Sequence, residues 1–158
     1  MSLNSHLLAV AVRISCHRTI TVCSLYLPPS LRLTKIDLDN LLSEFPLPII
    51  LLGNVNALSA NWGCLNNDSK GKIIEDLLLQ RSLSLMNHGS MTYLSLASGV
   101  QSAIDLSICD PSLNFDYCWK THRDLCGSDH FPIEITCDIA FRCQTNNSWK
   151  LRQSQLST

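Results

Sequence analysis

The sequence has few charged residues and no long hydrophobic run. Charged residues make up 16% of its 158 residues, and the formal net charge is −1 at pH 7. Proteins that bind nucleic acids without a specific site are usually basic, so the overall charge gives no support to DNA binding. No apolar run approaches the roughly 18 residues of a membrane-spanning helix, and we expect no membrane association.

The eight cysteines include no C-x-x-C pair, the spacing typical of a zinc site. An even number of cysteines is compatible with disulfides in a secreted protein. However, the apolar segment 7–12 is short and no basic segment precedes it, which disfavours a signal peptide. We therefore expect reduced thiols that act as small core residues, and a nuclear or cytoplasmic location rather than secretion.

Hydrophobic residues make up 46% of the sequence, enough for one domain with a core. Alternating patterns predict strands over 8–14 and 19–26, the second ended by Pro28 and Pro29. Thr34 is predicted to cap a helix that reaches Phe45, and the apolar run 48–52 reads as a buried strand. The predicted apolar face of this helix consists of Ile36, Leu38, Leu41 and Leu42.

A second helix is predicted over residues 71–82, with Ile73, Ile74, Leu77 and Leu78 facing inward. Further strands are predicted at 84–86, 91–94, 103–108, 114–119 and 131–138. This strand-rich pattern with two helices indicates an α+β or layered α/β fold. We expect residues 1–142 to form the domain and residues 143–158 to form a polar, disordered tail.

Four polar stretches follow apolar strands, at positions where loops commonly hold functional groups. Taken singly, each is compatible with an ordinary turn or with packing. Asp105 lies within an apolar run and needs a buried partner. Together with His130 it suggests a carboxylate–imidazole pair, which fixes a histidine in one tautomer. The other histidines are predicted to be incidental: His6, His17, His88 and His122.

The order of these stretches resembles the later part of the endonuclease/exonuclease/phosphatase family, in the version found in non-LTR (jockey- and LINE-like) retrotransposons. The family hallmarks are a tyrosine–proline strand end, Gly-Asp-Phe-Asn-Ala followed by Trp-Gly, a Thr-Tyr pair, Ser-x-Ile-Asp, and Gly-Ser-Asp-His-Phe-Pro-Ile. This sequence carries Tyr26 before Pro28-Pro29, Gly53-Asn54-Val55-Asn56-Ala57, Trp62-Gly63, Thr92-Tyr93, Ser102-Ala103-Ile104-Asp105 and Gly127-Ser128-Asp129-His130-Phe131-Pro132-Ile133. The similarity covers roughly residues 7–139. It implies a two-sheet β-sandwich flanked by helices, of which this chain would hold the C-terminal portion.

The resemblance also implies an activity, which is Mg²⁺-dependent hydrolysis of a DNA phosphodiester by water. His130 would contact the scissile phosphate and Asp105 would orient the imidazole. Asn56 and Tyr26 would hydrogen-bond the phosphate as charge develops. Asp129 would help to hold the metal or the nucleophilic water. Thr92 and Ser128 would support the site by hydrogen bonding.

Two departures from the family pattern put this activity in doubt. The position of Asn54 is an aspartate in the family, and an amide lacks the basicity to activate water. The family domain also has an N-terminal half with an early asparagine and a metal-binding glutamate, and this sequence begins after it. We therefore expect weakened Mg²⁺ binding and an impaired enzyme.

Three readings follow from the resemblance. In the first, the chain is endonuclease sequence from a polyprotein that ordinarily continues into a reverse transcriptase. In the second, it is a decayed, non-enzymatic copy with at most residual nucleic-acid binding. The third is another branch of the same fold, such as a phosphoinositide phosphatase or a secreted DNase. Trp62-Gly63 and the spacing from Thr92 to Asp105 disfavour the third reading.

Overall fold

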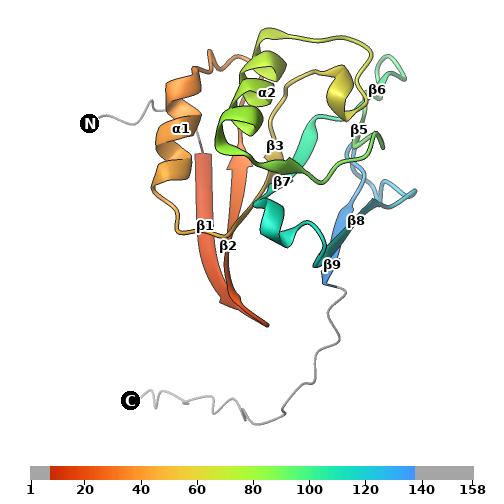
Figure 1. Cartoon of the computed structure of the whole chain (residues 1–158). Coiled ribbons are helices and arrows are strands. Elements are labelled where there is room, and N and C mark those ends of the chain that lie inside the picture. Colours follow the sequence, from red (N-terminus) through yellow and green to blue (C-terminus); the bar gives the residue numbers. More distant parts are fainter. Residues whose placement is uncertain (1–7, 138–158) are drawn as a thin grey trace, which may run out of the picture.

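A five-stranded sheet forms the centre of the computed structural model, which describes residues 8–137 (Figure 1). Its strands are β1 (Leu8–Ser15), β2 (Thr19–Tyr26), β3 (Ile49–Asn54), β7 (Asp105–Cys109) and β4 (Ser84–Leu85), in the order β1-β2-β3-β7-β4. β1 and β2 form an antiparallel hairpin, and β3 runs parallel to β2 and antiparallel to β7. The layered α/β fold is therefore confirmed.

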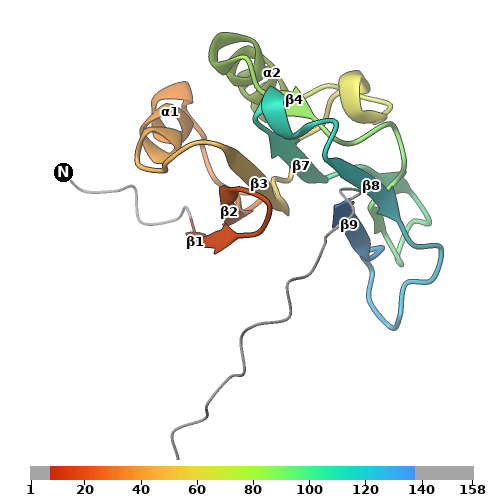
Figure 2. The same ribbon diagram turned by 60° about the horizontal axis from the view of Figure 1, so that its bottom comes forward.

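Two helices cover one face of this sheet (Figure 2). α1 (Lys35–Ser43) crosses over between the parallel strands β2 and β3, and α2 (Ser69–Arg81) follows the loop after β3. The side chains of β3 alternate between the two faces, as the period of a strand requires. Ile49 and Leu51 belong to the core under the helices, whereas Ile50 and Leu52 face the other side.

The opposite face is partly covered by a two-stranded hairpin of β8 (Tyr117–Thr121) and β9 (Ile133–Cys137). Trp119 is 5% exposed there and donates its indole N–H to the Ser107 hydroxyl at 2.9 Å. A further small sheet pairs β5 (Tyr93–Leu94) with β6 (Gln101–Ser102). Two short 3-10 segments, Ala60–Trp62 and Pro111–Leu113, complete the described elements.

The predicted elements are present with shifted ends. α1 begins after its predicted cap Thr34 but ends at Ser43, because Pro46 disfavours helical backbone at the preceding residue. α2 begins at Ser69, since the Asp68 side chain accepts a hydrogen bond from Gly71 N and acts as the cap. The predicted strand 114–119 was placed too early, because Pro111–Leu113 and the turn after it precede β8. The proposed tail 143–158 lies outside the described residues.

One predicted core residue is placed wrongly by the sequence pattern. Ile36 is 69% exposed, whereas its three predicted companions on α1 are buried. Ile36 lies in the first turn, beside the capping box, where the helix turns this position towards solvent. On α2, Ile74 and Leu77 are buried, and Ile73 and Leu78 are partly buried against the same core.

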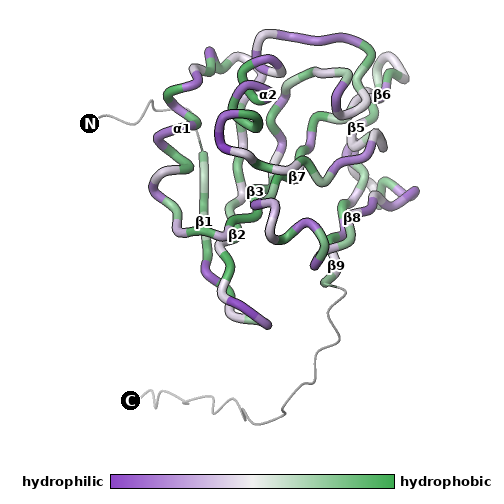
Figure 3. Tube along the Cα trace, in the orientation of Figure 1, coloured by the Kyte–Doolittle hydropathy of each residue, from purple (hydrophilic) through white to green (hydrophobic). Residues whose placement is uncertain are grey.

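The outer strand β1 presents a hydrophobic stripe on the face away from the helices. Ala9 and Ala11 pack against the core under the helices. The alternate positions are exposed: Leu8 by 64%, Val10 by 71%, Val12 by 54% and Ile14 by 43%. Figure 3 shows that the turn of the β1–β2 hairpin, in contrast, is hydrophilic. No helix within residues 8–137 has the length and hydropathy to cross a membrane.

Candidate active site

Strand register brings three of the predicted site residues together. Tyr26 on β2 is the Cα partner of Asn54 on β3, and Asn54 is the partner of Asp105 on β7. Partners in register point to the same face of a sheet, so the three side chains form a row. The row lies on the face of the β8–β9 hairpin, at the end of the sheet where β2 and β3 terminate.

Gly53 explains how β3 comes close enough to β2 at this point. A Cβ atom added to Gly53 would lie 1.8 Å from the Leu25 carbonyl oxygen, a distance that no side chain tolerates. Any other residue would push the two strands apart. The glycine before Asn54 therefore sets the spacing between Tyr26 and Asn54.

His130 reaches this row from the loop before β9. Its Nδ1 lies 2.7 Å from Asp105 Oδ2, which confirms the predicted carboxylate–imidazole contact. The two side chains are 32% and 16% exposed. A carboxylate only accepts hydrogen bonds, so neutral His130 carries its proton on Nδ1 and leaves Nε2 accessible.

Hydrogen bonds to the backbone fix both members of the pair. Thr92, which is 0% exposed, accepts a hydrogen bond from Asp105 N through its Oγ1 at 3.0 Å. The Ser128 hydroxyl accepts one from His130 N at 3.0 Å. The ring of Tyr93 lies against His130, with centroids 4.9 Å apart. Thr92 and Ser128 thus each accept a backbone hydrogen bond from one member of the pair.

The amides of Asn54 and Asn56 organise the loop after β3. Asn54 Oδ1 accepts a hydrogen bond from Asn56 N at 3.1 Å. Asn56 has a left-handed backbone (φ 46°) and donates one amide hydrogen to the Leu27 carbonyl at 3.0 Å. The side-chain oxygen of Asn54 therefore takes part in the turn, and Asn56 has a second amide hydrogen besides the one donated to Leu27.

Asp129 lies at the margin of the site. Its Oδ1 is 3.9 Å from His130 Nε2, and its side chain is 48% exposed. A cleft of about 460 Å³ opens between the sheet and the β8–β9 hairpin beside the His130–Asp105 pair. The cleft is lined by Leu52, Gly53, Asp105, Leu106, Ser107, His130, Phe131, Ile133 and Ile135.

The carboxylates on this rim do not fit a complete Mg²⁺ site. Mg²⁺ requires near-octahedral oxygen donors. Asp105 Oδ2 is engaged by His130, and Asp129 lies across the imidazole from it. Among the described residues, no three or more histidine, cysteine or acidic side chains form a group that could hold a metal ion.

Sequence reasoning missed Asn87 as a member of the site. This buried residue follows β4 and donates its amide to the Asp105 carbonyl at 3.0 Å, while its Oδ1 accepts from Ser107 N at 2.8 Å. It anchors the strand that carries Asp105. No local sequence pattern marks this role, because the amide bonds the main chain of a strand about twenty residues away.

Three of the histidines predicted to be incidental have polar partners in the part of the chain that the structure describes. His17 lies 3.3 Å from Asp116, His122 lies 2.9 Å from Glu134, and His88 contacts the Trp119 carbonyl at 3.2 Å. His6 lies outside the described residues. The contacts of His17 and His88 join segments far apart in the chain, which local sequence patterns do not reveal, whereas His122 contacts the opposite strand of its own hairpin.

A family model described as endonuclease-reverse transcriptase matches residues 20–134 of this chain. No curated protein matches it. Among solved structures, the endonuclease domain of TRAS1, a telomere-specific non-LTR retrotransposon, is similar with a TM-score of 0.75 and 24% identity. That similarity covers 84% of this chain and 64% of the TRAS1 chain.

Two other solved structures share the fold at lower identity. The 3′ phosphatase NExo from Neisseria, bound to product DNA hairpin, has a TM-score of 0.60 and 16% identity, covering 81% of this chain and 64% of its own. The catalytic domain of APE2 from Xenopus laevis has a TM-score of 0.54 and 18% identity, covering 83% and 54%. This chain thus spans less than two thirds of each of these structures.

Proposed function

This chain belongs to the endonuclease–reverse transcriptase family, and from that membership we propose that its site binds a DNA phosphodiester with little capacity to hydrolyse it. The proposal rests mainly on the 2.7 Å contact between His130 and Asp105. Asp105 is in strand register with Asn54, and Asn54 is in register with Tyr26. The similarity to the TRAS1 endonuclease domain and to DNA-bound NExo supports DNA as the substrate class. As in a retrotransposon polyprotein, a reverse transcriptase region would ordinarily follow.

The chain's own residues supply contacts to the phosphate. His130 approaches through Nε2, and when the imidazole is protonated Asp105 stabilises its charge at Nδ1. Tyr26 is 41% exposed and can donate its hydroxyl to a phosphate oxygen. Asn56 has one amide hydrogen left for a second oxygen. In the proposed complex these donors would hydrogen-bond the phosphate oxygens on which negative charge builds up during cleavage.

The step that is missing is activation of water. Asn54 occupies the position of the family aspartate, and its amide oxygen accepts the Asn56 N–H instead. An amide cannot take the proton of an attacking water, and general bases typically contribute about 10²–10⁴-fold to rate. This observation favours the second candidate function, a DNA-binding domain without hydrolytic activity.

Plasmid nicking separates the two candidates. We expect the purified chain to nick supercoiled plasmid in Mg²⁺ no faster than background, and Asn54→Asp alone not to restore activity, because the described donor set does not complete a Mg²⁺ site. A chimera with the N-terminal half of a related family domain should remain slow. The chimera carrying Asn54→Asp should nick robustly, since groups that act as one unit are strongly non-additive.

The contradicting results are equally clear. Mg²⁺-dependent nicking by the unmodified chain that disappears in His130→Ala would show that another acid has replaced the family aspartate. Strong nicking by Asn54→Asp alone would show that the chain holds a sufficient metal site by itself. Fluorescence anisotropy with a short duplex tests binding, and equal affinities for the parent chain and His130→Ala would remove this rim as the DNA site.

A further inference from the structure

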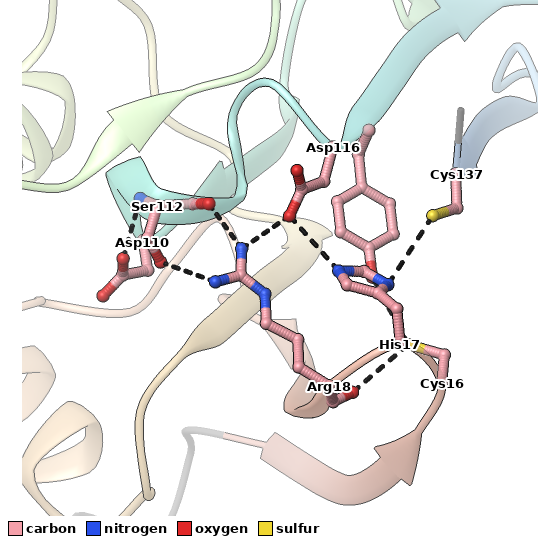
Figure 4. Close-up of polar contacts among 8 residues, drawn as sticks. Cys16, His17, Arg18, Asp110, Ser112, Asp116 and Cys137 are labelled. Atoms are coloured by element: carbon pink, nitrogen blue, oxygen red, sulfur yellow. Dashed lines mark hydrogen bonds and ion pairs between the residues drawn. The ribbon is translucent and has the colours of Figure 1, made fainter. Parts of the chain in front are cut away.

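A second polar cluster lies at the end of the sheet remote from the proposed phosphodiester site (Figure 4). The turn of the β1–β2 hairpin contributes Cys16, His17 and Arg18. Asp116 immediately precedes β8, and β9 ends at Cys137. The hairpin register runs from Leu8 opposite Tyr26, beside the site, to Ser15 opposite Thr19, beside this cluster. We call it the hairpin-end cluster.

His17 lies between a carboxylate and a thiol. Its Nε2 is 3.3 Å from Asp116 Oδ2, and its Nδ1 is 4.0 Å from Cys137 Sγ. A carboxylate only accepts, so neutral His17 has its proton on Nε2 and a lone pair on Nδ1. That lone pair lies within sulfur hydrogen-bonding distance of the thiol. The order carboxylate, imidazole, thiol is the arrangement in which a base takes the proton of a nucleophile.

Arg18 holds the carboxylate in place. Its Nη2 donates to Asp116 Oδ2 at 2.7 Å and also to the Ser112 carbonyl. The side chains of His17 and Asp116 are only 20% and 25% exposed, so solvent screens their interaction incompletely. The geometry at His17 is therefore fixed by contacts from three segments of the chain.

Tyr117 adds a neutral donor beside the thiols. Its hydroxyl lies 3.7 Å from Cys16 Sγ. Burial, followed by the hydrogen bond to Cys16, raises the pKa of Tyr117 well above its ordinary value. A tyrosine hydroxyl is protonated at neutral pH even at its ordinary pKa, and this shift moves its ionisation further away from neutral pH.

From this arrangement we propose that Cys137 is a nucleophilic thiol, a site for covalent modification by soft electrophiles of the hydroperoxide class, with His17 as its base and Asp116 as the residue that positions His17. In the reaction, the Cys137 S–H proton passes to His17 Nδ1 and the sulfur attacks one oxygen of the hydroperoxide. An S–O bond forms and the O–O bond breaks. The leaving oxygen takes up the proton and departs as water or an alcohol, so that the sulfur is oxidised to a sulfenic acid and the hydroperoxide is reduced.

The chain supplies its own reference thiols. Cys118 and Cys126 are exposed, whereas Cys137 is only partly exposed. If solvent exposure alone set the rate, Cys137 would react more slowly than Cys118 and Cys126. Cys23 and Cys109 are buried, and burial raises the pKa of both, that of Cys109 to about 11. These two thiols report unfolding, because they react only when the core opens.

The test is the rate of carbamidomethylation of each cysteine by iodoacetamide, followed by peptide mass mapping on the full chain. We expect Cys137 to react about tenfold faster than Cys118 and Cys126, below the ~10²–10⁴-fold typical of an optimally placed base. His17→Phe keeps a ring and removes the base, and should lower the Cys137 rate about tenfold while the rates of Cys118 and Cys126 stay the same. With hydrogen peroxide and dimedone as the trap, the first adduct should form on Cys137.

Two results would overturn the proposal. One is a Cys137 rate in the parent chain no higher than the rates of Cys118 and Cys126. The other is an unchanged Cys137 rate in His17→Phe while Cys23 and Cys109 remain protected. If His17→Phe exposes those buried thiols, His17→Asn serves in its place with the same expectation. If both variants unfold, the proposal is decided by whether Cys137 reacts faster than Cys118 and Cys126 in the parent chain.

Discussion

At the level of single residues, Thr92 determines where Asp105 lies. Its buried hydroxyl accepts the Asp105 N–H at 3.0 Å, so Thr92→Val leaves a partly buried donor without its acceptor. We expect the free energy of unfolding to fall by about 1–3 kcal/mol, the usual penalty for such a group. Urea denaturation measures the change. Thr136→Val, at an exposed strand position, should change it by less than about 0.5 kcal/mol, and equal effects of the two substitutions would contradict the assigned hydrogen bond.

The residue scale also shows what sequence reasoning can and cannot reach. The Asp105–His130 contact was predictable because an ionisable side chain within an apolar run needs a partner, and a histidine after a glycine turn was available. The role of Asn87 was not predicted, because an amide that bonds a distant main chain leaves no local pattern. The same holds for His17, whose partners Asp116 and Cys137 are about a hundred residues away in the chain.

At the level of elements, Asp68 connects the loop after β3 to α2. Its Oδ1 accepts from Gly71 N at 2.6 Å, as a helix cap, and from Leu58 N at 3.1 Å. Asp68→Ala removes both acceptors, and we expect a loss of about 1–2 kcal/mol in the free energy of unfolding. Asp76→Ala in the same helix removes only the solvent-exposed pair with Lys72 and should destabilise the chain clearly less, because solvent screens such pairs. Thermal unfolding of the two variants compares them, and similar midpoints would refute the double role of Asp68.

Element order was easier to predict than element pairing. The apolar run at β3 and the alternation of β1 and β2 show that these strands exist, and Thr34 shows where α1 begins. The sequence does not show that β3 lies between β2 and β7, because that position depends on the α1 crossover and on side chains that meet only in the folded sheet. Yet this order is what aligns Tyr26, Asn54 and Asp105.

At the level of the whole molecule, the two faces of the central sheet differ in how well they are covered. The helices bury one face from β1 to β7, whereas the β8–β9 hairpin covers the other face only over part of its width. The uncovered part is the β1 stripe of Leu8, Val10, Val12 and Ile14. It lies on the same face as the proposed phosphodiester site, since Leu8 is the register partner of Tyr26.

The stripe leads to a prediction about the behaviour of the chain in solution. Contiguous exposed apolar surface favours association, and within residues 8–137 β1 is also the edge strand of the central sheet. We expect the purified chain to bind the dye ANS and to self-associate with rising concentration. The double substitution Val10→Thr/Val12→Thr keeps β-branched side chains suited to a strand but makes the stripe polar. ANS fluorescence should fall and the sedimentation coefficient should lose its dependence on concentration.

Val100→Thr, at a loop valine that is 57% exposed, is the matched control and should change neither, because an isolated exposed valine forms no patch. If the double variant bound ANS and sedimented as the parent chain does, the stripe would not be the surface through which the chain self-associates. Association would then have to arise from the cleft beside His130, which these substitutions leave intact.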